Sequence, residues 1–226
     1  MDEKDIAQAN EDMESLLQSL ETIRHDSGGY TLLPKNHPNL IGHGETALVV
    51  ELTRQKIAKI VSYEEDEQHK GQYILVGGYV GASPHSIEET VIALREMGFN
   101  NVLDHVAVNR YPEFKHGKDH AITPYGYHIS LDLREGGKYK VFSIEEFPFG
   151  ELENGQALIA QMEESLVRIK ASLGSGEYML SVDRHATKDK PDEALKRMFI
   201  GRVNSQTNQG ELFFADLDHC VIQKTF

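Results

Sequence analysis

The chain has 226 residues, and its 23 lysines and arginines against 36 aspartates and glutamates give a formal net charge of −13. Because phosphate backbones repel such a charge, we expect no nucleic-acid partner. Hydrophobic residues make up 39% of the chain, which is enough for a core, but no apolar run of about 18 residues could span a membrane. The single cysteine, Cys220, excludes an internal disulfide, so we expect a cytoplasmic protein.

Residues 1–29 are expected to form an N-terminal helix. Apolar residues recur every three or four positions over residues 2–24, which is the spacing of an amphipathic helix, and Gly28-Gly29 lie beyond its end. A lone helix cannot bury its apolar stripe, so this one packs on the rest of the chain or docks a partner protein.

Residues 30–147 are rich in short apolar runs and predict a β-sheet with one helix. Three strands separated by turns are expected at residues 40–41, 47–52 and 56–61. Ser86 and Glu89 have the spacing of a capping box, which predicts a helix over residues 87–97 that Gly98 ends. Residues 135–138 (EGGK) separate two β-rich runs and predict a hairpin between residues 125–133 and 139–147.

Residues 148–226 are expected to form a second, smaller lobe. A connector rich in proline, glycine and acidic residues at 146–155 predicts the waist between the lobes. A helix is expected at residues 157–173, and short strands are expected at residues 178–182, 198–203 and 212–215. This order of elements predicts an α+β fold with two lobes.

Two segments of the first lobe carry residues suited to binding an anion. The glycines of Gly42-His43-Gly44-Glu45-Thr46 allow the backbone to approach a phosphate closely, although a plain turn is the alternative. Lys59 lies in an apolar strand, where alternation gives it the face of Ile57 and Val61, the apolar side. A lysine in that setting faces an anionic partner in a cleft or extends to solvent from a strand edge.

Two segments of the second lobe carry acidic residues at the ends of apolar strands. Asp183-Arg184-His185 follow one strand, and an aspartate there can accept a hydroxyl proton or cap a turn. Asp216 and Asp218 follow another strand two residues apart, so they can face the same way. Carboxylates held close together favour a neutralising cation, and oxygen ligands suit Mg²⁺, whereas a capping aspartate is the alternative.

The order of these four segments resembles the protein-kinase-like fold over about residues 38–222. The resemblance implies an ATP site between the lobes, in which the glycine turn covers the phosphates and Lys59 contacts them. It implies that Lys59 pairs with Glu88 or Glu89 of the predicted helix, and that the waist residues Glu146 and Phe147 offer backbone groups to adenine. By the same resemblance Asp183 is the catalytic base with His185 as a further acid or base, and Asp216 and Asp218 bind Mg²⁺.

The sequence motifs of the second lobe are similar to those of phosphoinositide-kinase-like enzymes, which carry D-R-H in the catalytic loop and G-x-L-F-x-x-D-F-G-H in the metal-binding strand. The length is similar to that of minimal kinases secreted as bacterial effectors, which would act in a host cytosol. Three positions depart from the family pattern: Ala47 replaces the third glycine, Lys188 replaces the metal-binding Asn, and Asp218 replaces the glycine of D-F-G. Ten residues follow Asp216, too few for an activation segment.

We therefore expect an atypical minimal kinase that binds ATP and Mg²⁺ and transfers the γ-phosphate to a hydroxyl of a protein or lipid. The alternative is a catalytically degenerate, pseudokinase-like module that binds nucleotide or a protein partner, with the N-terminal helix as the docking element. A third reading is an α+β protein outside the kinases in which Asp216 and Asp218 serve another metal reaction.

Overall fold

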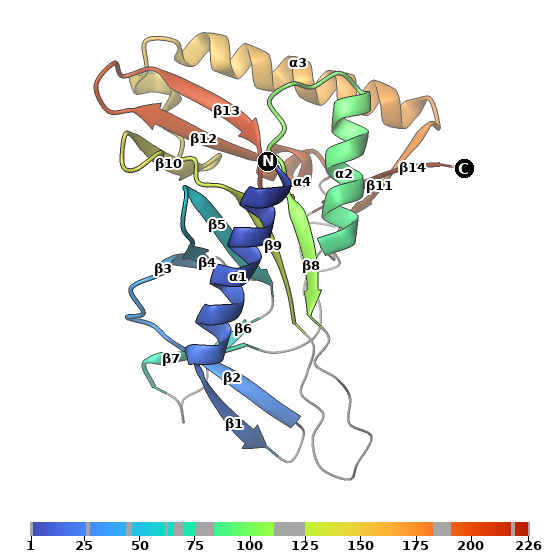
Figure 1. Cartoon of the computed structure of the whole chain (residues 1–226). Helices are drawn as coiled ribbons and strands as arrows, with labels where there is room; N and C mark the ends of the chain where they lie inside the picture. The colour runs from blue at the N-terminus through green and yellow to red at the C-terminus, as the bar shows by residue number, and fades with distance from the viewer. Residues whose placement is uncertain are drawn as a thin grey trace. The chain divides into compact units, whose positions relative to one another are not determined.

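The computed structural model describes residues 2–25, 28–43, 47–61, 63–65, 70–75, 84–110, 125–182, 191–217 and 220–225. The fold is mixed α+β, as the sequence predicts, and its sheets are antiparallel (Figure 1). The chain forms two compact units. Unit 1 consists of Met1–Val80 and Val106–Leu131, and unit 2 consists of Gly81–His105 and Asp132–Phe226.

Unit 1 begins with helix α1 (Glu3–Ser19), which is shorter than the helix predicted over residues 2–24. The Asp2 carboxylate caps the helix by accepting a hydrogen bond from the Asp5 N–H at 2.7 Å. The prediction fails beyond Ser19 because the next residues form strand β1 (Glu21–His25), which pairs antiparallel with strand β2 (Gly28–Pro34). Strand pairing satisfies the backbone groups that a longer helix would have bonded internally.

Unit 1 contains two sheets. The larger has the strand order β3-β4-β5-β9-β8, with every neighbouring pair antiparallel. Its strands are β3 (Leu40–His43), β4 (Ala47–Glu51), β5 (Lys56–Val61), β9 (Tyr125–Leu131) and β8 (Val106–Arg110). The smaller has the order β1-β2-β7-β6, with β7 at Gln72–Leu75 and β6 at Tyr63–Glu65. The three strands predicted between residues 40 and 61 are confirmed as β3, β4 and β5.

The core of unit 1 lies between α1 and the larger sheet. Figure 1 shows α1 running alongside the strands of this sheet. The helix contributes the buried residues Ala9, Met13, Leu16 and Leu17, and the sheet contributes Leu48, Val50, Ala58, Ile60, Tyr127 and Ile129. Burial of one such large apolar side chain is worth about 1.5–3 kcal/mol. The apolar stripe of α1 is therefore covered by the helix's own chain.

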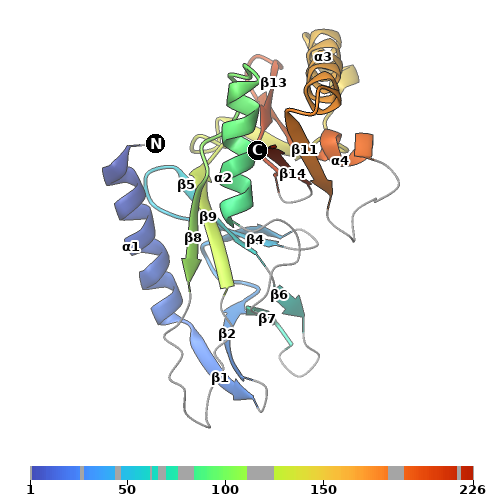
Figure 2. The same cartoon turned by 90° about the vertical axis from the view of Figure 1, so that its right-hand side faces the viewer.

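Unit 2 combines the remaining helices with a three-stranded sheet and a two-stranded pair. The helices are α2 (Pro84–Glu96), α3 (Gly155–Gly174) and α4 (Pro191–Arg197), with a 3₁₀ turn at Phe149–Glu151. The sheet has the order β10-β12-β13, with β10 at Tyr139–Ser143, β12 at Phe199–Asn204 and β13 at Gly210–Phe214. Strand β11 (Tyr178–Val182) pairs antiparallel with β14 (Cys220–Lys224), and α2 lies beside this pair (Figure 2).

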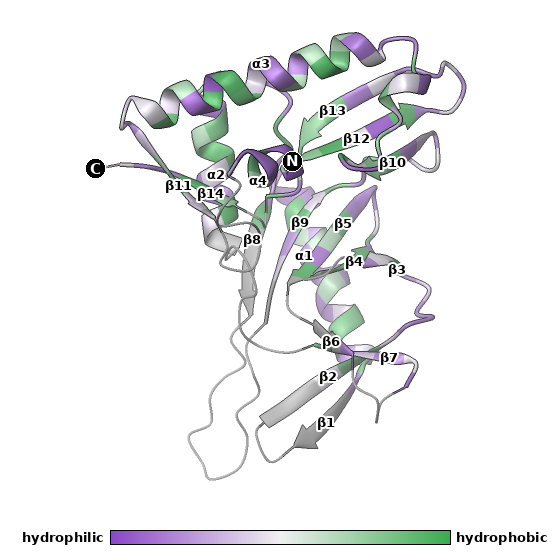
Figure 3. Cartoon of the chain, turned by 180° about the vertical axis from the view of Figure 1, so that it is seen from behind, coloured by the Kyte–Doolittle hydropathy of each residue, from purple (hydrophilic) through white to green (hydrophobic). Residues whose placement is uncertain are grey.

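The core of unit 2 is aromatic at its centre. The Phe214 ring lies 4.3 Å from the Phe199 ring and 5.0 Å from the Phe99 ring, measured between centroids. Helix α3 turns an apolar face to this core, and Figure 3 shows its apolar and polar residues alternating in bands. The inward residues of α3 are Leu158, Met162, Leu166 and Ile169. The helix predicted over residues 157–173 is confirmed.

The hairpin predicted around residues 135–138 does not form. Strand β9 is bonded along one edge to β5 and along the other to β8, so no edge remains for β10, which pairs with β12 instead. The turn itself exists: Glu135, Gly136 and Gly137 have φ angles of 45°, 67° and 91°. These three left-handed residues redirect the chain into another sheet instead of folding it back.

Two further boundaries differ from the expected ones. The chain crosses between the units after Val80, after His105 and after Leu131, whereas the connector at 146–155, predicted as the waist, lies inside unit 2. Helix α2 starts at Pro84, so Ser86 lies inside the first turn and is not the cap that the capping-box pattern predicts. The buried side chains of α2, which include Ile87, Val91 and Leu94, belong to the core of unit 2 and not to that of unit 1.

Candidate functional site

Lys59 lies on β5, the middle strand of the larger sheet in unit 1. In the strand register Gly42 pairs with Val49, Val49 with Lys59, and Lys59 with His128. These residues form one row across four neighbouring strands, and two strand spacings separate the Cα atoms of Gly42 and Lys59 by about 10 Å. The register shifts between Leu40 and Gly42, which marks a β-bulge beside the glycine turn.

The side chain of Lys59 is half-buried and lies on the face of β5 opposite Ala58 and Ile60. Ala58 and Ile60 are fully buried beneath α1, so they mark the apolar side of the strand. The expectation that Lys59 shares the apolar side is therefore wrong, although Lys59 does share its face with the half-buried Ile57. The error arises because the strand is apolar on both faces, and only the position of α1 decides which face becomes core.

Only the first part of the predicted glycine turn is described. Gly42 is half-buried, and no atom of the described residues lies within 4 Å of the position that a Cβ on Gly42 would take. His43 is exposed, and its ring centroid lies 5.8 Å from that of Tyr73. Gly44, Glu45 and Thr46 lie outside the described residues.

The two glutamates proposed as partners of Lys59 are half-buried on α2, in unit 2. The carboxylate of Glu89 accepts a hydrogen bond from the side-chain amide of Gln223 on β14. Glu88 precedes it on the same helix. Pairing of either glutamate with Lys59 stays a prediction, and Glu89 already has a partner within unit 2.

Asp216 lies just beyond the end of β13 in unit 2. The backbone N–H groups of Ala215 and Asp216 donate to the carbonyl oxygen of Met198 at 2.9 and 3.2 Å, which fixes the chain as it leaves the strand. Burial, with the nearby Asp216 carboxylate as a second cause, raises the pKa of the Cys220 thiol to about 12. Asp216 is therefore close enough to Cys220 for its charge to act on the thiol.

Cys220 lies opposite the last described residue before the predicted catalytic loop. In the β11–β14 register Cys220 lies directly opposite Val182, which is the last described residue before Asp183. Asp183, His185 and Asp218 lie outside the described residues. Within the described ranges, no group of three or more histidine, cysteine, aspartate or glutamate side chains is arranged to hold a metal ion. A magnesium site at Asp216 and Asp218 stays a prediction.

The predicted adenine contacts, Glu146 and Phe147, lie inside unit 2 and form part of a compact turn. The Glu146 N–H donates to the Ser143 carbonyl at 3.2 Å, and the Phe147 carbonyl accepts from the Phe149 N–H at 2.8 Å. The Phe147 ring is buried, 4.7 Å from the Phe149 ring. The Glu146 N–H and the Phe147 carbonyl are therefore engaged in the turn, and adenine recognition by this segment stays a prediction.

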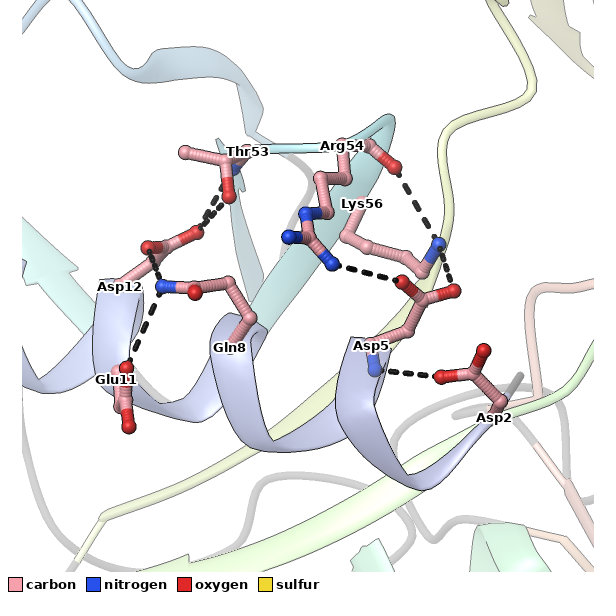
Figure 4. A network of polar contacts seen from close by, with 8 residues as sticks. All are labelled: Asp2, Asp5, Gln8, Glu11, Asp12, Thr53, Arg54 and Lys56. Carbon is pink, nitrogen blue, oxygen red and sulfur yellow. Dashed lines mark hydrogen bonds and ion pairs between the residues drawn. The ribbon is translucent and has the colours of Figure 1, made fainter.

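A polar network between α1 and the turn that joins β4 to β5 was not foreseen from the sequence (Figure 4). Asp12 accepts hydrogen bonds from the backbone N–H of Thr53 at 3.0 Å and from its hydroxyl. Burial tends to raise the pKa of Asp12, but these hydrogen bonds outweigh it and hold the pKa below its usual value. Asp5 pairs with Lys56, whose side chain is only 6% exposed.

A signal for this network was present in the sequence. Asp5 and Asp12 are seven residues apart on α1, so they lie on the same face of the helix. That pattern alone does not identify their partners, since acidic residues also occur on solvated helix faces.

Comparisons of this chain with protein-family models, with curated proteins and with solved structures found no match. The resemblance to kinases therefore depends on the residues and geometry given above. None of the helices within the described ranges is both long enough and apolar enough to cross a membrane.

Proposed function

We propose that this protein is an atypical minimal kinase that binds ATP and Mg²⁺ and transfers the γ-phosphate to a hydroxyl group of a protein or lipid. The observation that carries the proposal is the row that joins Gly42 to Lys59 across the larger sheet of unit 1. In protein kinases a glycine-rich loop covers the phosphates and the phosphate-binding lysine stands on the third strand. Lys59 is on the third strand of this sheet in chain order, and the glycine turn follows the first.

In unit 2 the described residue that supports the proposal is Asp216, whereas the roles of Asp183 and Asp218 are proposed from the sequence. Strand β13 ends at Phe214, two residues before Asp216, and the Asp216 carboxylate contributes to the raised pKa of Cys220, which pairs with Val182. In the proposed reaction the acceptor oxygen attacks the γ-phosphorus, the bond to the β–γ bridging oxygen breaks, and the acceptor proton passes to the Asp183 carboxylate. Asp216 and Asp218 would hold Mg²⁺, which supplies charge neutralisation at the phosphates.

Few reactive groups are needed for this chemistry, because phosphoryl transfer is catalysed mainly by positioning and by electrostatic stabilisation. Lys59 and the backbone of the glycine turn would orient the phosphates, and His185 is the further acid or base. A cytosol, of the cell itself or of a host, supplies the ATP.

One observation favours the catalytically degenerate alternative, a pseudokinase-like module that binds nucleotide or a protein partner. Active kinases need the ion pair between the strand lysine and a helix glutamate. Here Glu89 is hydrogen-bonded to Gln223 within unit 2, and Lys188 stands where the metal-binding Asn of the family would be. A protein that keeps the fold and loses this pair would bind ATP without transferring phosphate.

Incubation with γ-labelled ATP and Mg²⁺ separates the two functions. We expect label on a generic hydroxyl acceptor or on the protein itself, and its loss in Asp183→Asn and Asp216→Asn. Asp192→Asn is the matched control, because this α4 carboxylate is exposed and pairs with Lys170 at 2.7 Å. Binding of ATP without transfer favours the degenerate module that binds nucleotide. Absence of ATP binding overturns the kinase and leaves only the module that binds a protein partner.

A further inference from the structure

Strand β5 carries two lysines that serve opposite faces of the sheet. Lys56 and Lys59 are three residues apart, so strand alternation directs them to different sides. Lys56 lies on the α1 side, where its Nζ is 3.4 Å from an Asp5 carboxylate oxygen and 3.3 Å from the Arg54 carbonyl oxygen. A buried ammonium needs such partners, because removal of a charge from water is costly unless it is paired.

The turn that joins β4 to β5 has an unfavourable backbone for its residues. Arg54 and Gln55 have φ angles of 54° and 58°, and the Lys56 N–H donates to the Thr53 carbonyl at 3.3 Å. This is the pattern of a type I′ turn, whose two central positions favour Asn-Gly. Arg and Gln adopt left-handed φ angles only where the surrounding structure holds them.

The groups that hold this turn come from α1 (Figure 4). One Asp12 carboxylate oxygen accepts from both the N–H and the hydroxyl of Thr53, and the other accepts from Gln8 Nε2 at 3.1 Å. The second Asp5 oxygen lies 3.6 Å from the Arg54 guanidinium. Two carboxylates one heptad apart therefore contact three of the four residues at Thr53–Lys56.

The turn determines which lysine faces which side. Because side chains alternate along a strand, a slip of β5 by one residue would exchange its two faces. Lys59 would then enter the core now filled by Ala58 and Ile60, and Lys56 would lose Asp5. Fixing the turn therefore fixes the face of Lys59.

We propose that α1 positions Lys59: the Asp5 and Asp12 carboxylates hold the β4–β5 turn in its left-handed conformation and thereby select the register in which Lys59 faces away from α1. The nucleotide part of this inference rests on the proposed function, whereas the register part does not. Asp5 and Asp12 are positioning residues, and the N-terminal helix becomes a control element for the phosphate-binding lysine.

The first test measures the dissociation constant of Mg·ATP by isothermal titration calorimetry. We expect Asp12→Asn to weaken binding about tenfold, which corresponds to about 1.4 kcal/mol. Glu11 is an exposed acidic residue on the same helix that contacts Gln8 but no residue of the turn, so Glu11→Gln should stay within about twofold of the wild type on the same scale. Met13→Ala removes apolar packing of α1 but keeps both carboxylates, so it should weaken Mg·ATP binding less than Asp12→Asn does.

A rescue variant separates positioning from a merely structural role. Replacing Arg54 and Gln55 by Asn-Gly gives the turn its favoured residues, so it should restore Mg·ATP affinity in the Asp12→Asn background. The inference is overturned if the rescue fails, or if Met13→Ala weakens binding as much as Asp12→Asn does.

The register is tested without nucleotide by limited acylation with acetic anhydride and mass spectrometry of each lysine. In the wild type Lys56 should be protected from acylation, and either Asp12→Asn or Asp5→Asn should speed its acylation about tenfold. Replacing Arg54 and Gln55 by Asn-Gly should restore the protection of Lys56 in the Asp12→Asn background. Unchanged protection of Lys56 in both variants would overturn the inference. If the wild type binds no ATP but Lys56 behaves as expected, the proposed function fails and the positioning of β5 stands.

Discussion

Gly155, the first residue of α3, packs too closely against the preceding 3₁₀ turn to carry a side chain. A Cβ at this position would overlap the carbonyl oxygen of Phe149 and would lie 2.8 Å from its carbonyl carbon. The Gly155 N–H donates to the Leu152 carbonyl at 3.2 Å, so the start of the helix cannot simply shift away. Overpacking against side chains typically costs about 1–3 kcal/mol, and because backbone must move here we expect Gly155→Ala to cost about 3 kcal/mol.

Urea denaturation followed by far-ultraviolet circular dichroism measures this cost. Gly174→Ala is the matched control at the other end of the same helix, where no described atom lies within 4 Å of the added Cβ. Because alanine is the better helix former, the control should gain up to about 1 kcal/mol. If Gly155→Ala is as stable as the wild type, the packing described between the 3₁₀ turn and α3 is wrong.

Two further predictions concern titratable groups in unit 2. Burial, together with Asp216, raises the pKa of the Cys220 thiol to about 12. The native thiol should therefore resist alkylation by iodoacetamide at pH 8 and react once urea unfolds the protein. Alkylation of the native protein at the rate of a free thiol would contradict this prediction. Hydrogen bonds from Lys224 and Tyr178 hold the pKa of Glu96 below its usual value of 4.5. The ionised Glu96 therefore stabilises the folded protein above pH 4.5, and this contribution is lost as the pH falls through the lower native pKa. Glu96→Gln should make the urea midpoint less dependent on pH in the acid range. An unchanged pH dependence of the midpoint would refute the assignment.

The elements that could be predicted from the sequence are those set by local periodicity. Leu158, Met162, Leu166 and Ile169 repeat at helical spacing and are the residues that α3 buries. The closeness of Gly42 to Lys59 was implied by the resemblance to kinases and not by local periodicity. It arises because consecutive antiparallel strands joined by short turns lie side by side.

The remainder depends on contacts between residues far apart in the chain, which local patterns do not encode. The EGGK turn at residues 135–138 predicts a hairpin of β9 with β10. Strand β10 pairs with β12 instead, because both edges of β9 are occupied by β5 and β8. The contact between Asp12 and Thr53 spans 41 residues and depends on where α1 packs. For the same reason the face of β5 that becomes core could not be chosen from β5 alone.

The most direct test of the kinase hypothesis is a calorimetric titration of the wild type, Lys59→Met and Asp216→Asn with ATP in the presence of Mg²⁺. We expect saturable binding by the wild type and at least about tenfold weaker binding by each variant, which corresponds to a loss of about 1.4 kcal/mol of binding free energy in each case. If the wild type releases no heat of binding, or if either variant binds ATP as tightly as the wild type, then Lys59 and Asp216 do not serve one nucleotide.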